Sequence, residues 1–298
     1  LFTDPQLQAL IEKGLENNTD FRTAHLRVQE AEAALMTSRL AYLPALNLTP
    51  QGTISSFDGS KAAKSYQLAA SASWEIDIFG RLTNAKRSAQ AALEQTKSYK
   101  QAVRTQLIAT IANSYYTLLL LDKQLVISER TASLWKENVQ AMQALKKAGL
   151  TNEAAVSQSE ANCLSVEASL LTLRQQINEM ENSLSNLLGE VPQRVERGNL
   201  DCQEFPETLS TGVPLALLGN RPDVRQAEYS LAQAFYTTNG ARSAFYPNIN
   251  LSGVAGWTNS GGGIIANPGG LLLQAIGSLT QPLFNRGVNI ANLKIAKS

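Results

Sequence analysis

The sequence carries the same landmarks twice, in the same order, and this internal repeat constrains the fold more than any other feature. A repeat of this kind indicates one supersecondary unit used twice, with neither copy able to bury its apolar surface alone. Pro5 and Pro214 each begin a short expected helix at its first position, where the missing N–H costs nothing. The matched segments, at offsets of 203 to 205 residues, are 20–24 with 223–227, 42–48 with 245–251, and 78–81 with 283–286.

The repeat divides the chain into three expected parts. These are a first repeat over residues 1–190, a linker over 191–213 and a second repeat over 214–298. We expect the first repeat to contain a helix, a β-hairpin over 44–79 and a long helical hairpin over 82–188. The second should contain a helix, a β-hairpin over 247–284 and the start of another helix, which makes it an incomplete copy.

Within each repeat the hydrophobic period changes from helical spacing to a period of two. Pro44 ends the first helical pattern, because proline disfavours helical geometry in the residue before it. Between residues 66 and 78, apolar side chains alternate with polar or small ones, which predicts a strand with one oily and one wet face. About 10 such residues are enough to cross a membrane as a strand. The alternative interpretation of this alternation is an edge strand of a soluble β-sandwich, with one face on the core. Residues 271–283 alternate poorly, and only the repeat predicts a strand there.

A long helical hairpin is predicted between the two β-hairpins. Residues 82–147 contain neither proline nor glycine, and at about 1.5 Å per residue they would form a rod about 100 Å long. After Gly149, apolar residues from Val156 to Leu187 alternate in steps of three and four over more than four heptads, which predicts left-handed coiled-coil packing. The positions beside this stripe are mostly Ser, Asn, Gln and Ala, which favours a wall of helices over a filament-type coiled coil.

Composition and motifs argue against catalysis and nucleic-acid binding. The 26 basic and 25 acidic residues leave a net charge of +1, without the basic footprint of a nucleic-acid-binding protein. The two cysteines, Cys163 and Cys202, form neither a disulfide framework nor a metal motif. His25 is the single histidine, in a predicted helix, and no phosphate-binding or dinucleotide-binding motif occurs. We therefore expect no enzyme activity, no catalytic or metal-binding residues and no cofactor.

Several motifs resemble those of the TolC/OprM outer-membrane factors, most closely the OprM-like lipoproteins of resistance-nodulation-division pumps. The central signature of that family is similar to LGEVP, GVP and NRPDVRQAE here, and the other motifs lie in the family's order across nearly the whole chain. The matching stretches are EIDIFGR (75–81), ATIANSY (109–115), LGEVP (188–192), GVP (212–214), NRPDVRQAE (220–228) and ARSAFYP (241–247).

The resemblance implies a mainly α-helical fold with a β-hairpin in each repeat, placed in the bacterial outer membrane with its helices in the periplasm. A homotrimer would join the strands into a 12-stranded outer-membrane β-barrel. The protein would then be a passive exit duct for drugs, metals or other small molecules. Its partners would be a periplasmic adaptor protein, an inner-membrane pump and outer-membrane lipid, with no nucleic acid. The chain would be a C-terminally truncated member, without the second helical hairpin that constricts the entrance in this family.

The resemblance also assigns roles to residues. The turn between the long helices would contact the adaptor, and the two faces of the 66–78 strand would meet lipid and lumen. A periplasmic coiled-coil scaffold or adaptor-type protein is the alternative function, in which these strands stay out of membranes. The assigned residues are Ala148, Gly149, Leu150 and Thr151 at the tip; Leu68, Ala70, Ala72, Trp74 and Ile76 facing lipid; and Gln67, Ser71, Ser73, Glu75 and Asp77 facing the lumen.

Overall fold

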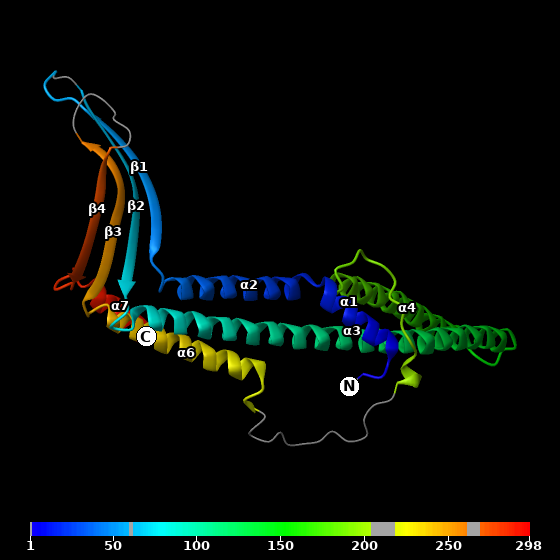
Figure 1. The fold of residues 1–298 in the computed structure, drawn as a ribbon. Helices are drawn as coiled ribbons and strands as arrows, with labels where there is room; N and C mark the ends of the chain where they lie inside the picture. The colour runs from blue at the N-terminus through cyan, green and yellow to red at the C-terminus, as the bar shows by residue number, and fades with distance from the viewer. Residues whose placement is uncertain (1, 60–61, 204–217, 261–268) are drawn as a thin grey trace. The chain divides into compact units, whose positions relative to one another are not determined.

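The computed structural model describes residues 2–59, 62–203, 218–260 and 269–298 (Figure 1). The expected helix start at Pro214, the GVP motif, the glycine-rich run 261–263 and the later part of the predicted linker lie outside the described residues. No helix in the described ranges combines the length and the apolar character needed to cross a membrane. The elements are α1 (Pro5–Asn17), α2 (Thr19–Leu40), β1 (Ala45–Ser55), β2 (Ala63–Ile76), α3 (Arg81–Lys147), α4 (Glu153–Leu187), η1 (Leu200–Cys202), α6 (Pro222–Ser243), β3 (Asn248–Ser260), β4 (Gly270–Thr280) and α7 (Val288–Lys297).

The chain divides into two compact units, and each contains segments from distant parts of the sequence. The first unit combines Leu1–Leu26 with Lys100–Leu215, and the second combines Arg27–Tyr99 with Ala216–Ser298. The boundary passes through α2 and α3, so each of these helices contributes residues to both units.

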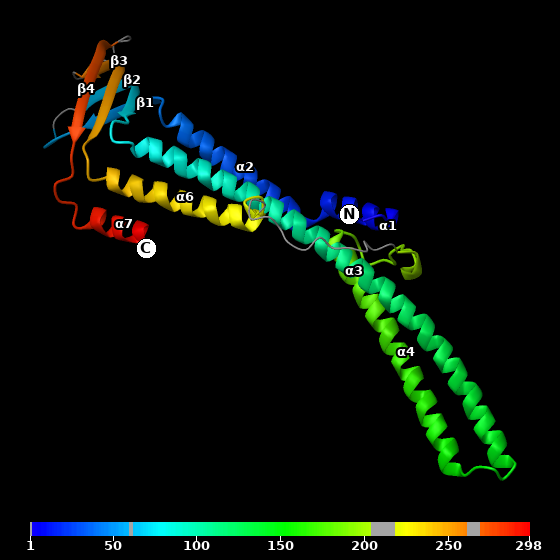
Figure 2. The same ribbon diagram turned by 90° about the horizontal axis from the view of Figure 1, so that it is seen from below.

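The first unit is a helical hairpin of α3 and α4, with α1 packed near its open end (Figure 2). Its core contains Leu7 of α1, Ile111 and Leu118 of α3, Leu184 of α4 and Val195 of the following segment, all buried. The heptad prediction for α4 is confirmed. Val156, Ser159, Cys163, Ile177 and Leu184 are buried, and the stripe positions between them are half-buried.

The second unit contains one antiparallel sheet with the strand order β1-β2-β3-β4. β1 and β2 form one hairpin, and β3 and β4 form the other. The pairing of β2 with β3 joins the two hairpins, so the repeats share one sheet. α2, α3, α6 and α7 all connect to the same end of this sheet (Figure 1).

The predicted strand over 66–78 extends two residues too far. β2 ends at Ile76, and Asp77, predicted to lie in the strand, follows it. The carboxylate of Asp77 accepts hydrogen bonds from the backbone N–H groups of Leu82 and Thr83, at 3.1 and 2.8 Å, and from the Thr83 hydroxyl at 2.7 Å. Because these N–H groups lack partners within the first turn of α3, Asp77 caps that helix instead of continuing the strand.

Candidate functional site: a two-faced sheet and a helical tip

The strand register places most of the apolar residues of the four strands on one face of the sheet. Residues directly opposite each other in an antiparallel pair share a face. Leu46 lies opposite Ala72, Trp74 lies opposite Leu251, and Trp257 lies opposite Leu271. We call the resulting surface the apolar face. Its members include Leu46, Leu48, Leu68, Ala70, Ala72, Trp74, Ile76, Ile249, Leu251, Gly253, Ala255, Trp257, Leu271, Leu273, Ala275 and Leu279.

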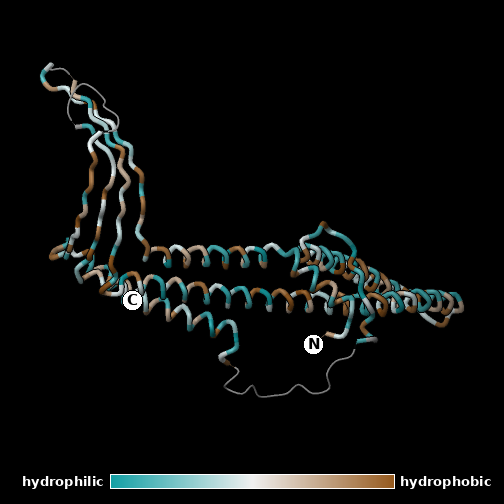
Figure 3. The backbone as a smooth tube through the Cα atoms, in the orientation of Figure 1, coloured by the Kyte–Doolittle hydropathy of each residue, from teal (hydrophilic) through white to brown (hydrophobic). Residues whose placement is uncertain are grey.

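The opposite face, here the polar face, carries mainly amides, hydroxyls and one carboxylate. Its polar residues include Gln67, Ser71, Ser73, Asn250 and Gln274, together with Glu75 near the helix-connected end. Leu272 and Ile276 of β4 lie on this face by their parity, which explains why 271–283 alternates poorly in the sequence. The alternation along the strands can be followed in Figure 3.

The apolar face is exposed. Leu46 is 79% exposed, Leu273 is 70% exposed and Leu279 is 69% exposed. Burying such side chains stabilises a protein by about 1.5–3 kcal/mol each. Contiguous exposed apolar surface of this kind marks a site that contacts another protein or a membrane. Of the sequence-assigned residues, Leu68, Ala70, Ala72, Trp74 and Ile76 lie together on this face, and Gln67, Ser71, Ser73 and Glu75 lie together on the other.

The helix-connected end of the sheet is fixed by side-chain hydrogen bonds. Trp74 Nε1 donates to the carbonyl oxygen of Tyr42 at 2.8 Å, and the Tyr42 hydroxyl donates to Thr83 Oγ1 at 3.0 Å. On the polar face, Glu75 forms a bidentate ion pair with Arg81, with Nε–Oε1 at 2.7 Å. Both carboxylates singled out in the sequence, Glu75 and Asp77, therefore bind the start of α3.

The tip of the helical hairpin is the turn between α3 and α4. Gly149 has φ +76°, a conformation that glycine adopts without strain, and Leu150 N–H donates to the carbonyl oxygen of Leu145 at 3.0 Å. Asn152 caps α4 through Ala155 N–H at 3.0 Å. Leu150 is 75% exposed, so Gly149 shapes the turn and Leu150 presents an apolar side chain at its surface.

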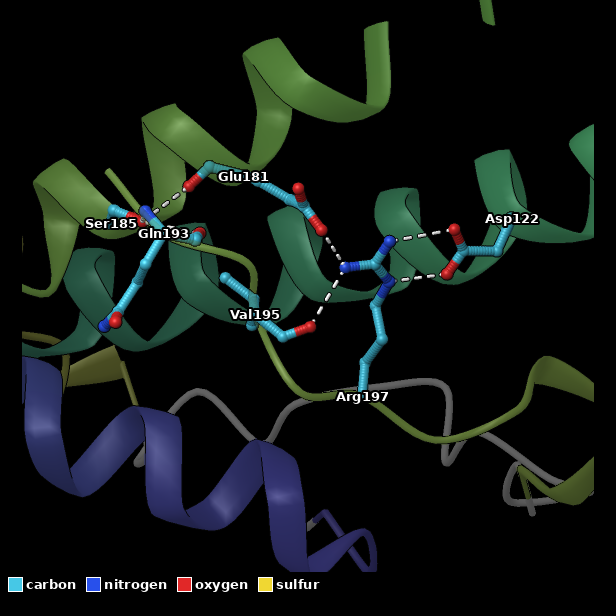
Figure 4. Close-up of polar contacts among 6 residues, drawn as sticks. All are labelled: Asp122, Glu181, Ser185, Gln193, Val195 and Arg197. Atoms are coloured by element: carbon cyan, nitrogen blue, oxygen red, sulfur yellow. Dashed lines mark hydrogen bonds and ion pairs between the residues drawn. The ribbon is translucent and has the colours of Figure 1, made fainter. Parts of the chain in front are cut away.

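Arg197 is a buried arginine of the first unit that the sequence did not predict as important (Figure 4). The side chain of Arg197 is 8% exposed, forms two hydrogen bonds to Asp122 of α3, at 2.5 and 2.9 Å, and also pairs with Glu181 of α4. Hydrogen bonding to Asp122 raises the pKa of Arg197 against the burial that opposes it. The segment after α4 thus ties α3 to α4, and no local sequence pattern distinguishes Arg197 from a surface arginine.

A second polar cluster joins the residue before α1, helix α3 and the segment that follows α4. The Tyr115 hydroxyl donates to Asp4 Oδ2 at 2.5 Å and accepts from Gly198 N–H at 3.1 Å, and Gln203 donates to the same carboxylate at 2.8 Å. Burial and the hydrogen bond to Asp4 raise the pKa of Tyr115 to about 12. Asp4 also caps α1 through Gln6 N–H at 2.9 Å.

Among the described residues, no group of three His, Cys, Asp or Glu residues is placed to hold a metal ion.

The comparisons with known proteins agree with this geometry. The model of the family described as "Outer membrane efflux protein" matches residues 10–190 and 213–298. The chain belongs to this family. The resemblance, the fold class and the outer-membrane location predicted from the sequence are therefore confirmed, and the names of the family and its relatives are those of efflux proteins rather than enzymes.

Individual relatives match almost the whole chain. The cation efflux system protein CusC of Escherichia coli O157:H7 is 30% identical over 99% of this chain, and the solvent efflux pump outer membrane protein SrpC of Pseudomonas putida is 28% identical over 99%. The chain spans 65% of the length of each of these relatives. The outer membrane channel MtrE of Neisseria gonorrhoeae, solved in its open state, superposes with a TM-score of 0.87 at 30% identity, over 99% of this chain and 67% of that one.

Proposed function

We propose that the protein is the outer-membrane channel subunit of a tripartite efflux pump and serves as a passive exit duct. The observation that carries this proposal is the exposed apolar face, which the register extends across all four strands. β1, β3 and β4 contain no charged residue, and the one charge that the register of the described strands places on this face is Lys64, near the hairpin end of β2. The rest of the surface can meet hydrocarbon without burying a charge. The lipid-facing and lumen-facing residues assigned from the sequence, apart from Asp77, lie on opposite faces as the proposal requires.

The sheet needs further strands to enter a membrane. Within the described residues, β1 and β4 each pair with one neighbour only, which leaves two edges of unpaired backbone groups. Such groups are costly in lipid, where only helices and closed barrels satisfy them. A homotrimer, with four strands from each copy, would close a barrel of 12 strands and remove every edge. The polar face would then line a wet lumen.

The helical tip is the proposed contact for a periplasmic adaptor protein. Ala148, Gly149 and Leu150 are exposed and Thr151 is half-buried, so the turn offers a small, accessible surface to a partner. An inner-membrane pump would supply the energy for transport, because a duct without an energy source only permits passage. Its cargo would be drugs, metal ions or other small molecules, in line with the cation and solvent efflux named for the two relatives.

Single-channel recording tests the duct directly. The purified protein, reconstituted into planar bilayers, should form trimers by chemical crosslinking and give stepwise ionic conductance. Monomers without conductance, recovered from the soluble fraction after cell breakage, would contradict the proposal. That result would favour the alternative of a periplasmic coiled-coil scaffold, in which the strands stay out of membranes.

A further inference from the structure

The helix-connected end of the sheet is strongly basic. Three stretches of sequence contain the segments joined to this end of the sheet, residues 33–57, 78–93 and 229–298, and none of them contains an aspartate or glutamate. Their charged residues are all basic: Arg39, Arg81, Lys86, Arg87, Arg242, Arg286, Lys294 and Lys297. The nearest carboxylates in the sequence are Glu75 of β2, which pairs with Arg81, and Asp77 just after β2, which caps α3. A net charge of +1 for the whole chain therefore conceals a positive charge concentrated at one end of the sheet.

One of these cations is linked by contacts to Trp74 of the apolar face. Trp74 belongs to that face, and its indole N–H donates to the carbonyl oxygen of Tyr42. The ammonium of Lys86 lies 5.7 Å from the centroid of the Tyr42 ring, a cation–π distance. Arg81, by contrast, pairs with Glu75, whose parity places it on the polar face. The chain of contacts from Trp74 through Tyr42 to Lys86 thus links an amine to the helix-connected end of the apolar face.

These residue types suit the boundary between the hydrocarbon of a membrane and its lipid headgroups. Tryptophan and tyrosine favour the boundary between hydrocarbon and water, and lysine extends its aliphatic stem along apolar surface while its ammonium reaches the polar side. Basic residues near a membrane surface attract anionic lipids by about 1 kcal/mol each. We infer, resting on the proposed function, that Lys86 and the basic end around it bind the headgroup of an anionic phospholipid in the leaflet next to the helices.

Quenching of Trp74 fluorescence by brominated phospholipid tests this inference. The sequence contains three tryptophans, and two of them, Trp74 and Trp257, belong to the apolar face. Replacing Trp257 by Phe therefore leaves Trp74 as the tryptophan of that face, while Trp135 belongs to α3. Reconstituted protein should bind brominated phosphatidylglycerol about fivefold more tightly than brominated phosphatidylcholine, the factor that corresponds to about 1 kcal/mol. The preference should fall as salt is raised, because salt screens the attraction.

Two variants and a matched control assign the preference to this site. Lys86→Gln should abolish most of it, and Lys86→Arg should keep it. Lys97→Gln removes the same charge three turns further along α3 and should leave the preference unchanged. Equal binding of the two lipids, a preference that survives Lys86→Gln, or an equal loss in Lys97→Gln would overturn the inference while leaving the proposed function standing. If neither lipid quenches Trp74, the sheet lies outside the bilayer, and both the inference and the proposed function fail.

Discussion

Gly256 of β3 lies directly opposite Ala69 of β2, and the two backbones approach so closely that a side chain at Gly256 has no room. A Cβ atom there would stand 2.5 Å from Ala69 Cα and still closer to the carbonyl oxygen of Leu68. This contact is in the strand pair that joins the two repeats. We expect Gly256→Ala to force β2 and β3 apart and to lower the free energy of unfolding by about 1–3 kcal/mol.

Thermal unfolding in detergent measures this effect, and Gly253→Ala on the same strand is the control. A Cβ at Gly253 would meet Gln274 O at 3.8 Å, which is ordinary contact. Equal melting temperatures for the two variants would show that β2 and β3 pair differently from the register described above.

Tyr115→Phe should destabilise the first unit. The substitution removes the hydrogen bond to Asp4 and leaves Gly198 N–H without the hydroxyl that accepts from it. Gly198 is exposed and its N–H can bind water, so the main loss is the hydrogen bond to the charged Asp4 carboxylate, which contributes about 1.5–3 kcal/mol. Chemical denaturation followed by the fluorescence of Trp135 measures the loss, and an unchanged midpoint would contradict the contact.

The same pair predicts how stability depends on alkaline pH. Because the pKa of Tyr115 is raised to about 12 in the folded protein and is about 10 in the unfolded chain, the unfolded chain loses this proton first. The contribution of Tyr115 is therefore fully present below pH 10 and is lost as the pH rises to about 12. The stability difference between the protein and Tyr115→Phe should shrink across this window. A constant difference would mean that the hydroxyl titrates as a free tyrosine.

Arg197→Met should destabilise the protein far more than an equivalent change at the surface. Removing the guanidinium leaves Glu181, whose side chain is 13% exposed, without a counter-charge, and breaking a buried pair in this way costs about 3–5 kcal/mol. Arg174→Met is the matched control, because Arg174 and Glu129 are 59% and 48% exposed and such pairs contribute about 0–1 kcal/mol. Similar urea midpoints for the two variants would show that Arg197 does not clamp α3 to α4.

Leu150→Ser should weaken the proposed adaptor contact without affecting the fold. Leu150 is 75% exposed at the tip, so its replacement should change the free energy of unfolding by less than about 0.5 kcal/mol. Co-purification with the adaptor, compared with that of Leu171→Ser, measures the contact. Leu171 is 67% exposed on α4 but lies away from the turn. Equal recovery of the adaptor with both variants would contradict the assignment of the tip.

The sequence predicts the elements of this fold well where their signals are local. A helix without proline or glycine, a heptad stripe and a period of two each depend on neighbouring residues, and α3, α4 and β2 follow them closely. The pairing of β2 with β3 has no local signal, because it joins segments from the two repeats. β4 shows why alternation alone is insufficient, since Leu272 and Ile276 are apolar residues on the polar face.

In the candidate site, too, the features with a local sequence signal were predicted and those that depend on distant residues were not. The register places the two sets of assigned residues on opposite faces of the sheet, except for Asp77, where the capping of α3 outweighs continuation of the strand. Arg197 was not foreseen, because its partners Asp122 and Glu181 are distant in sequence and each resembles a surface residue. Three-dimensional packing alone brings them together.

Spin labels at Ala70 and Ser71 give the most direct test of the central claim, that the sheet stands in a membrane with its apolar face toward lipid. The two residues are neighbours on β2 and point to opposite faces. Each would be replaced by cysteine, with Cys163 and Cys202 changed to serine, and labelled in reconstituted protein. The account predicts that the label at Ala70 is relaxed by oxygen, which concentrates in lipid, and the label at Ser71 by a water-soluble nickel complex. Labels that both respond to the nickel complex and not to oxygen would contradict it.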